Sequence, residues 1–115
     1  MQLDFQNQIQ AIGYNDVMLE SDFQAKLIKE LKAMGLAVIK CQAGPGVPTG
    51  FPDILALGQG VYYALECKAS ARAKKQPRQD YWVNKLNEWS YAAFVYPANH
   101  DKVLDEIRHM EGLSL

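Results

Sequence analysis

The sequence predicts a single α/β domain in which helices flank one sheet. Three observations support this fold class: a helical spacing of apolar residues within 16–34, a hairpin pattern within 54–67, and a second helical spacing within 77–89. The chain has 115 residues and shows no internal repeat, low-complexity tract or linker. This length corresponds to one domain that can bury its own core.

The first helix is expected within residues 16–34. Its apolar positions recur at helical spacing, and they are Leu19, Phe23, Leu27, Ile28, Leu31 and Met34. Gly35 then fits the end of a helix. Because Ser21 and Gln24 have the spacing of a capping box, the helix begins either near Asp16 or at Ser21.

Three strands are expected next, and the second and third form a hairpin. Residues 36–41 are predicted as the first strand, followed by the glycine- and proline-rich loop 43–52. Residues 54–57 and 61–67 are rich in aliphatic, aromatic and β-branched side chains, with Gly58-Gln59-Gly60 between them. The glycines supply the backbone freedom that a tight turn needs.

The register of this hairpin brings charged residues together. If Gln59-Gly60 is a two-residue loop, Asp53 lies directly opposite Glu66, with Cβ atoms roughly 4.5–5.5 Å apart. Because side chains alternate along a strand, Lys68 shares the face of Glu66. Leu65 and Cys67 point to the other face. The hairpin thus gathers two carboxylates and an ammonium group.

Opposed carboxylates repel each other unless a cation lies between them or one of them takes up a proton. Mg²⁺ prefers hard oxygen ligands and keeps several waters, so two carboxylates and a substrate phosphate suit it. Lys68 could then position or deprotonate water, or neutralise charge on the phosphate. The alternative is an exposed hairpin end carrying a Glu66–Lys68 surface pair.

The remaining elements are a helix over 77–89, a strand over 92–96 and a helix over 101–110, giving the order α-β-β-β-α-β-α. Pro77 suits the first turn of a helix. The inward positions are expected to be Trp82, Leu86 and Trp89 in the first of these helices and Val103, Leu104 and Ile107 in the second.

Composition is that of a globular protein, with 49% hydrophobic and 22% charged residues, so disorder is not expected. The first ten residues lack the features of a signal peptide, and no apolar run approaches the roughly 20 residues that span a bilayer. Cys41 and Cys67 form no metal-binding spacing and are expected to be reduced thiols. We therefore expect a cytoplasmic protein without membrane contact.

A basic segment follows the hairpin, although the net charge of the chain is only −1. No acidic residue occurs in 67–79, and this stretch holds five of the twelve Lys and Arg residues: Lys68, Arg72, Lys74, Lys75 and Arg78. The segment is either a solvated loop or a site for phosphates. Its position directly after the carboxylate-bearing hairpin favours phosphate binding.

Two polar residues lie on helix faces that are predicted to point inward. Glu20 shares a helical line with Gln24 and Leu27, and Gln79 shares one with Trp82. A core-facing Glu is unusual unless it is paired or binds a metal. Alternatively, Glu20 is a helix-start carboxylate favoured by the macrodipole, and Gln79 is a first-turn residue with no role in a site.

This set of residues resembles the motifs of the PD-(D/E)xK nuclease superfamily, and within it the VRR-NUC family of virus-type replication-repair nucleases. The motifs are Glu20, Gly50-Phe51-Pro52-Asp53, Glu66-Cys67-Lys68 and Gln79. The resemblance covers about residues 19–97 of a single domain spanning 1–115, with 1–15 as a peripheral segment. It implies a restriction-endonuclease-like α-β-β-β-α-β core with a mixed sheet flanked by helices.

The resemblance also implies the residues of the site. Glu20, Asp53 and Glu66 would bind Mg²⁺ or Mn²⁺ together with the backbone carbonyl of Cys67, and Lys68 and Gln79 would complete the catalytic site. The expected activity is hydrolysis of phosphodiester bonds in four-way junctions or other branched DNA. The DNA phosphates beside the cut would contact the basic segment through Arg72, Lys74, Lys75 and Arg78.

The resemblance further implies an intracellular homodimer, with a phage as one expected source. The apolar segment Leu3–Ile12 is our candidate for part of the dimer contact, with packing on its own chain as the alternative. His100 and His109 are expected at the surface. The aromatic residues are expected to be mostly core, with stacking on unpaired bases as the alternative: Tyr62, Tyr63, Tyr81, Trp82 and Trp89.

Three rival functions remain open from sequence. A DNA-binding module without catalysis would keep the basic segment but would not need every acidic motif position. A Mg²⁺-dependent hydrolase of small phosphate esters would share the metal ligands without needing the basic segment. A structural subunit would bind neither metal nor DNA.

Overall fold

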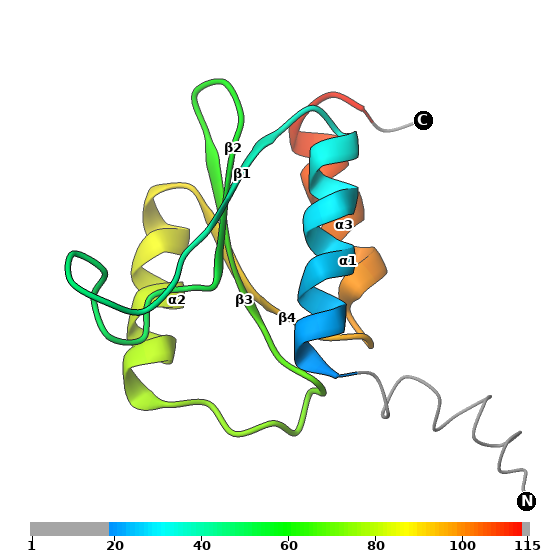
Figure 1. Cartoon of the computed structure of the whole chain (residues 1–115). Coiled ribbons are helices and arrows are strands. Elements are labelled where there is room, and N and C mark those ends of the chain that lie inside the picture. The colour runs from blue at the N-terminus through cyan, green and yellow to red at the C-terminus, as the bar shows by residue number, and fades with distance from the viewer. Residues whose placement is uncertain (1–18, 114–115) are drawn as a thin grey trace, which may run out of the picture.

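The computed structural model describes residues 19–113, and the order of its elements is the predicted α-β-β-β-α-β-α (Figure 1). The elements are α1 (Glu20–Ala33), β1 (Ala37–Lys40), β2 (Ile54–Leu57), β3 (Tyr62–Cys67), α2 (Pro77–Trp89), β4 (Tyr91–Val95) and α3 (His100–Met110). The predicted bounds of α2 agree with the structure at both ends.

The four strands form one mixed sheet in the order β1-β2-β3-β4. The first three strands are antiparallel, and β4 runs parallel to β3. A parallel neighbour requires a crossover connection, and α2 supplies it between β3 and β4. The predicted α/β class is confirmed, and the arrangement is compatible with a restriction-endonuclease-like fold.

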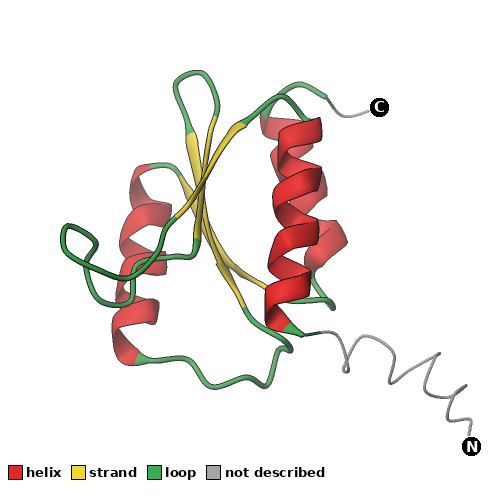
Figure 2. Ribbon diagram, in the orientation of Figure 1, coloured by secondary structure: helices red, strands yellow, loops and turns green. Residues whose placement is uncertain are grey.

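Helices cover both faces of the sheet, with α2 on one side and α1 and α3 on the other (Figure 2). The larger core lies on the α1 and α3 side and includes Phe23, Leu27, Leu31, Ile54, Tyr63, Val95 and Ile107. The smaller core, beneath α2, is built on Ala64, Val83, Leu86 and Ala92. Because both faces are covered, five of the six residues of β3 are buried without alternation.

The hairpin register agrees with the prediction. Leu57 pairs with Tyr62 and Ile54 pairs with Leu65, so the next position outward sets Asp53 against Glu66. The Gly58 N–H donates to the Val61 carbonyl at 3.0 Å and closes the turn. Slippage by one residue would turn every side chain to the opposite face, so this register determines which groups meet at the strand ends.

Two predictions about the helices were wrong. The capping box at Ser21 does not form, because α1 already begins at Glu20, with Leu19 as its N-cap. Trp89, expected to point inward, is 67% exposed, since it is the last residue of α2 and lies beyond the sheet-facing Val83 and Leu86.

The prediction that His100 lies at the surface was also wrong, because this side chain is buried. Its ring lies between the carboxylates of Glu30 and Asp101, at 2.7 and 2.8 Å, and meets the ring of Phe23 edge-on. The imidazole thus links α1 to α3. His109 is exposed, as predicted.

The N-terminal segment Leu3–Ile12 lies outside the described residues. Both cysteines are free, and Cys67 is buried in the core. Within residues 19–113, no helix is long and apolar enough to cross a membrane.

Candidate active site

The predicted site residues converge on one end of the sheet. Asp53 directly precedes β2, Glu66 is the penultimate residue of β3, and Lys68 follows that strand. Gln79 lies in the first turn of α2. The N-termini of α1 and α2 and the end of β3 all lie at this end (Figure 1). Two helix N-termini therefore direct their positive ends toward the same region.

Glu66 is the buried centre of this cluster, with 3% of its surface exposed. Its Oε2 accepts a hydrogen bond from Nε2 of Gln79 at 3.0 Å. Its Oε1 is buried and has no hydrogen-bond partner among the described residues. Asp53 is held beside it, because its Oδ2 accepts from the backbone N–H of Cys67 at 2.9 Å. Most buried polar atoms are paired, so the free Oε1 requires an explanation.

Gln79 joins the acidic and basic groups of the cluster. Its Oε1 accepts from Nζ of Lys68 at 2.8 Å and from the backbone N–H of Gln76 at 3.0 Å. The second bond is the one that a capping box makes at a helix start, so Gln79 both caps α2 and belongs to the site. Lys68 is itself buried, and its Nζ lies 3.9 Å from Oε2 of Glu66.

The two carboxyl groups carry more negative charge than their surroundings compensate. Burial, and then the charge of Asp53, raises the pKa of Glu66 to about 8, although Lys68 acts in the opposite direction. Burial also raises the pKa of Asp53, against the N–H of Cys67, the positive charge of Lys68, a hydrogen bond with the carboxyl group of Glu66 and the positive charge of Lys40. Such a pair takes up a proton or binds a cation.

The donor set fits a hard divalent cation. Glu66 presents an unpaired buried oxygen beside a second carboxylate, and oxygen ligands are those that Mg²⁺ and Mn²⁺ prefer. The described part of the chain contains no group of three His, Cys, Asp or Glu side chains arranged to hold a metal. The protein therefore offers two carboxylates here, and remaining positions would fall to backbone oxygen, water or a phosphate.

Glu20 does not join this pair. It is exposed, contrary to the prediction that it faces the sheet. A helical side chain leans toward the N-terminal turn, and Glu20 is the first helical residue, so no earlier turn covers it. Its charge nevertheless reaches the site, because it contributes to the raised pKa of Glu66.

A pocket of about 480 Å³ opens onto Asp53, Glu66 and Gln79. Its other wall is the loop between β1 and β2, which contributes Cys41, Ala43, Gly44, Val47, Pro48, Thr49, Gly50 and Phe51. This volume lies in the range of ligand pockets. Asp53 is thus partly accessible to a substrate group, while Glu66 lines the pocket with most of its surface buried.

Gly50 fixes this loop against α2, and sequence reasoning did not find that role. Its φ is +84°, and a Cβ built there would lie 2.5 Å from Cβ of Arg78 and 2.9 Å from the backbone nitrogen of Gln79. Only glycine permits so close an approach. The neighbouring ring of Phe51 packs edge-on against Trp82 of α2, with centroids 5.4 Å apart. The sequence motif includes Gly50, but its close contact with Arg78 on α2 could be seen only in the folded structure.

The basic segment runs from β3 to α2 across the same end of the sheet (Figure 2). Arg72, Lys74, Lys75 and Arg78 are exposed, whereas Lys68 belongs to the buried cluster. Lys75 also lies 4.9 Å from the ring centroid of Phe94. Four cations of this segment thus face solvent at the end of the sheet where the carboxylate pair lies.

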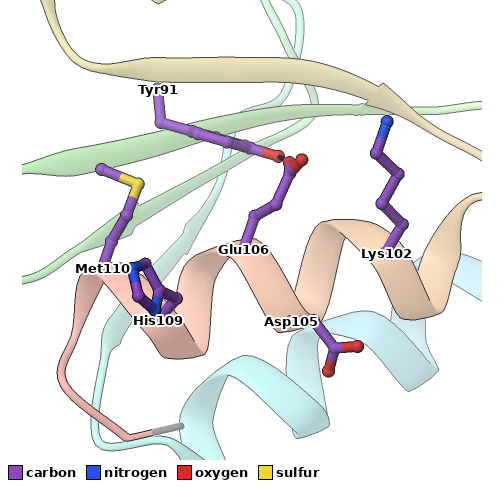
Figure 3. A pocket seen from close by; sticks show the side chains of 6 residues that line it. All are labelled: Tyr91, Lys102, Asp105, Glu106, His109 and Met110. Atoms are coloured by element: carbon purple, nitrogen blue, oxygen red, sulfur yellow. Dashed lines mark hydrogen bonds between the residues drawn. The ribbon is translucent and has the colours of Figure 1, made fainter.

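A second hollow, of about 770 Å³, lies between β4 and α3 (Figure 3). Tyr91, Lys102, Asp105, Glu106, His109 and Met110 line it. Its acids are already paired, because Glu106 accepts from the hydroxyl of Tyr91 and Asp105 pairs with Arg108 at 2.9 Å. It therefore lacks the buried, unpaired carboxylate oxygen that distinguishes the pocket at Glu66.

The predicted aromatic residues divide between core and surface. Tyr63 is buried, Tyr62 and Trp82 are partly buried, and Tyr81 and Trp89 are exposed. The hydroxyl of Tyr62 donates to the Leu86 carbonyl at 2.6 Å, which fixes this side chain beneath α2. Only the two exposed rings keep the alternative role of stacking on a partner.

Comparison with known proteins places the site in a family. Residues 20–95 match the archaeal Holliday junction resolvase (Hjc) family, and this range contains every predicted site residue. No curated protein and no solved structure matches the chain significantly. Because the match spans more than half of the chain, and the observed sheet and helices are compatible with a nuclease fold of the PD-(D/E)xK type, the chain belongs to the archaeal Holliday junction resolvase (Hjc) family.

Proposed function

We propose that this protein is a divalent-metal-dependent endonuclease that hydrolyses phosphodiester bonds in four-way junctions or other branched DNA. The observation that carries the proposal is the unpaired buried Oε1 of Glu66 beside Asp53, in a pocket at the end of the sheet that the exposed basic segment crosses. The family supplies the class of substrate. Membership of the VRR-NUC family and a phage origin stay predictions.

Each side chain of the cluster has a definable task. Asp53 and Glu66 would hold Mg²⁺ or Mn²⁺, with the backbone carbonyl of Cys67 as a further ligand. When bound, such a cation offsets charge on the scissile phosphate and activates water for attack. Lys68 provides a fixed positive charge for the phosphate, because its ammonium is held by Gln79 at 2.8 Å. The exposed Glu20 would contribute negative charge to the metal site from its edge.

Gln79 keeps Lys68 and Glu66 in place without neutralising either. An amide offers both an acceptor and donors, so one side chain can bridge an ammonium and a carboxylate. The basic residues Arg72, Lys74, Lys75 and Arg78 would contact phosphates on either side of the cut, which gives affinity without reading sequence. Cutting two strands symmetrically requires two such sites, so we propose that the protein is a homodimer. A nuclease that acts on DNA would work inside a cell.

The test compares cleavage of a synthetic four-way junction with that of a linear duplex and of deoxynucleotide monophosphates, in Mg²⁺, Mn²⁺ or EDTA. We expect junction cleavage with either metal and none in EDTA. Asp53→Asn and Glu66→Gln should abolish it, since both variants preserve shape and one acceptor oxygen while removing the charge and replacing the second oxygen by an NH2 donor. Asp105→Asn, the same change in the other hollow, is the matched control.

The remaining results favour the rivals. Turnover of monophosphates but not of junctions would indicate a hydrolase of small phosphate esters. Junction binding without cleavage in any metal would indicate a binding module, and absence of both would indicate a structural subunit. Cleavage by Asp53→Asn at the parent rate would contradict the site assignment.

A further inference from the structure

The two aromatic side chains that are most open to solvent lie on the same helix. Among the large hydrophobic residues of 19–113, Tyr81 is 48% exposed and Trp89 is 67% exposed, and no other exposed residue of this set is aromatic. Both belong to α2. With Arg78 and Lys85 they occupy positions spaced by three, four and four residues, which places all four on one face of the helix. We call this set of four residues the α2 stripe.

Cations accompany both rings of the α2 stripe. The guanidinium carbon of Arg78 lies 5.4 Å from the ring centroid of Tyr81, and Nζ of Lys85 lies 5.6 Å from that of Trp89. Rings paired with cations are what proteins use to bind single-stranded nucleic acid, because bases stack on the rings and phosphates meet the cations. The stripe contains two such pairs in succession.

The α2 stripe begins at the candidate active site. Arg78 adjoins Gln79, whose amide holds Lys68 and Glu66. A series of edge-on ring contacts also leads from the pocket to the stripe, from Phe51 to Trp82 at 5.4 Å and from Trp82 to Tyr81 at 5.3 Å. At 1.5 Å per residue, the helix carries the stripe about 16 Å from Arg78 to Trp89. Among the helices of residues 19–113, α2 alone covers this side of the sheet (Figure 1).

The charges of α2 decide between duplex and single-stranded DNA. Its two cations are balanced by Asp80 and Glu88, and Glu88 pairs with Lys85 at 3.8 Å. Beyond Arg78, the charged residues of the helix are Asp80, Lys85 and Glu88, so this part of α2 gains little from the phosphates of a duplex, whose affinity is mainly electrostatic. The rings can bind only bases that are not already stacked within a helix. Stacking, rather than charge, must therefore supply the affinity of this face.

We propose that the α2 stripe binds unpaired nucleotides of the strand that leaves the active site. The inference rests on the proposed nuclease function and adds, to the paired arms of its branched substrate, bases that come unpaired at the branch point beside the cut. The basic segment would contact the paired arm, Arg78 would lie where the two surfaces meet, and Tyr81, Lys85 and Trp89 would contact the unpaired strand. Trp89, at the far end, would be the outermost stacking platform.

The test measures binding of a fluorescent oligothymidine and of a duplex with the same number of phosphates, in EDTA, so that no cleavage interferes. Trp89→Ala should weaken oligothymidine binding on the order of 5- to 150-fold and leave duplex binding unchanged. Trp89→Phe should retain most of the affinity because it retains a ring. Met110→Ala, which shortens a side chain of comparable exposure on α3, is the control and should change neither affinity.

Three results would overturn the inference while leaving a role on DNA open. The first is an equal loss of affinity for both DNAs in Trp89→Ala, and the second is no loss of affinity for either. The third is a smaller mass for Trp89→Ala than for the parent in light scattering, because the α2 stripe would then be a contact between copies of the chain. Absence of all DNA binding would overturn it together with any role on DNA. If the parent binds oligothymidine through Trp89 but cuts no DNA in Mg²⁺, the nuclease proposal fails and the binding surface stands.

Discussion

Replacing Gly50 by alanine should slow DNA cleavage about a hundredfold, because a displacement near 1 Å at a catalytic group costs about that much. An added Cβ would lie 2.5 Å from Cβ of Arg78 and 2.7 Å from its backbone carbon. Ordinary contacts begin at 3.4 Å, so the loop and α2 must separate by about 0.9 Å. The obstructing atoms belong to the helix itself, so a side-chain rotation cannot relieve the contact.

The displacement is transmitted to the site through Gln79. Its bonds to Lys68 and Glu66 are 2.8 and 3.0 Å long, and a shift of this size takes both beyond the roughly 3.2 Å at which such bonds weaken. Lys68 and Glu66 would then lose the bridge that orients them. The carboxylates of Asp53 and Glu66 would remain, so metal binding should suffer less than turnover.

Gly46 provides a matched control within the same loop. Its φ is +90°, close to the +84° of Gly50, but a Cβ there meets nothing within 4 Å. Alanine at either position pays the roughly 1–2 kcal/mol strain of a left-handed backbone. Only Gly50→Ala adds the steric overlap, which should lower its free energy of unfolding by about a further 1–3 kcal/mol.

The assay is single-turnover cleavage of a four-way junction at saturating Mg²⁺, below the melting temperature of every variant. Gly50→Ala should lower the rate with little change in junction affinity, and Gly46→Ala should cut at close to the parent rate. Urea unfolding measures the stability difference independently of activity. Equal rates and equal stabilities for the two variants would refute the reasoning.

Three further predictions follow. Four exposed cations predict a slope of log K against log salt of about −3 to −4 for duplex binding in Ca²⁺. The triple variant Arg72→Ala, Lys75→Ala, Arg78→Ala should make this slope shallower by up to about three. An equal slope for the parent and the variant would exclude this segment as the DNA contact. The pKa of Glu66 is raised to about 8, so the folded protein binds the extra proton, and in EDTA its stability should fall as pH rises from about 4.5 to 8. Urea unfolding of Glu66→Gln should show less of this dependence, and an identical pH profile would contradict the shift. Light scattering should give about twice 12.9 kDa, and a mass near 12.9 kDa would exclude the dimer.

The hairpin could be predicted from sequence because its determinants are local. A short glycine-containing turn fixes the register of the two strands, and the alternation of side chains then places Asp53, Glu66 and Lys68 without knowledge of the rest of the fold. The helix over 77–89 was equally accessible, since Pro77 marks its first turn and the next residues show helical spacing. The roles of these side chains in catalysis stay predictions.

The failures share a different origin, because they depend on what lies across the fold. Helical periodicity places Glu20 and Trp89 on inner lines, but it does not say where the covering sheet ends. His100 is buried by Glu30 on α1, seventy residues away along the chain. The contact of Gly50 with Arg78 likewise joins a loop to a later helix. Such contacts leave no mark in a local pattern.

The bridge made by Gln79 explains how a buried cluster can keep a carboxylate oxygen free. Without this bridge, Lys68 could approach Glu66 as a close ion pair, and the negative charge of Glu66 would be neutralised within the protein. The amide instead holds Nζ of Lys68 3.9 Å from Oε2 of Glu66 and occupies that oxygen itself. Oε1 is left with Asp53 as its charged neighbour. The ammonium and the unpaired oxygen thus remain separate, one suited to a phosphate and the other to a cation.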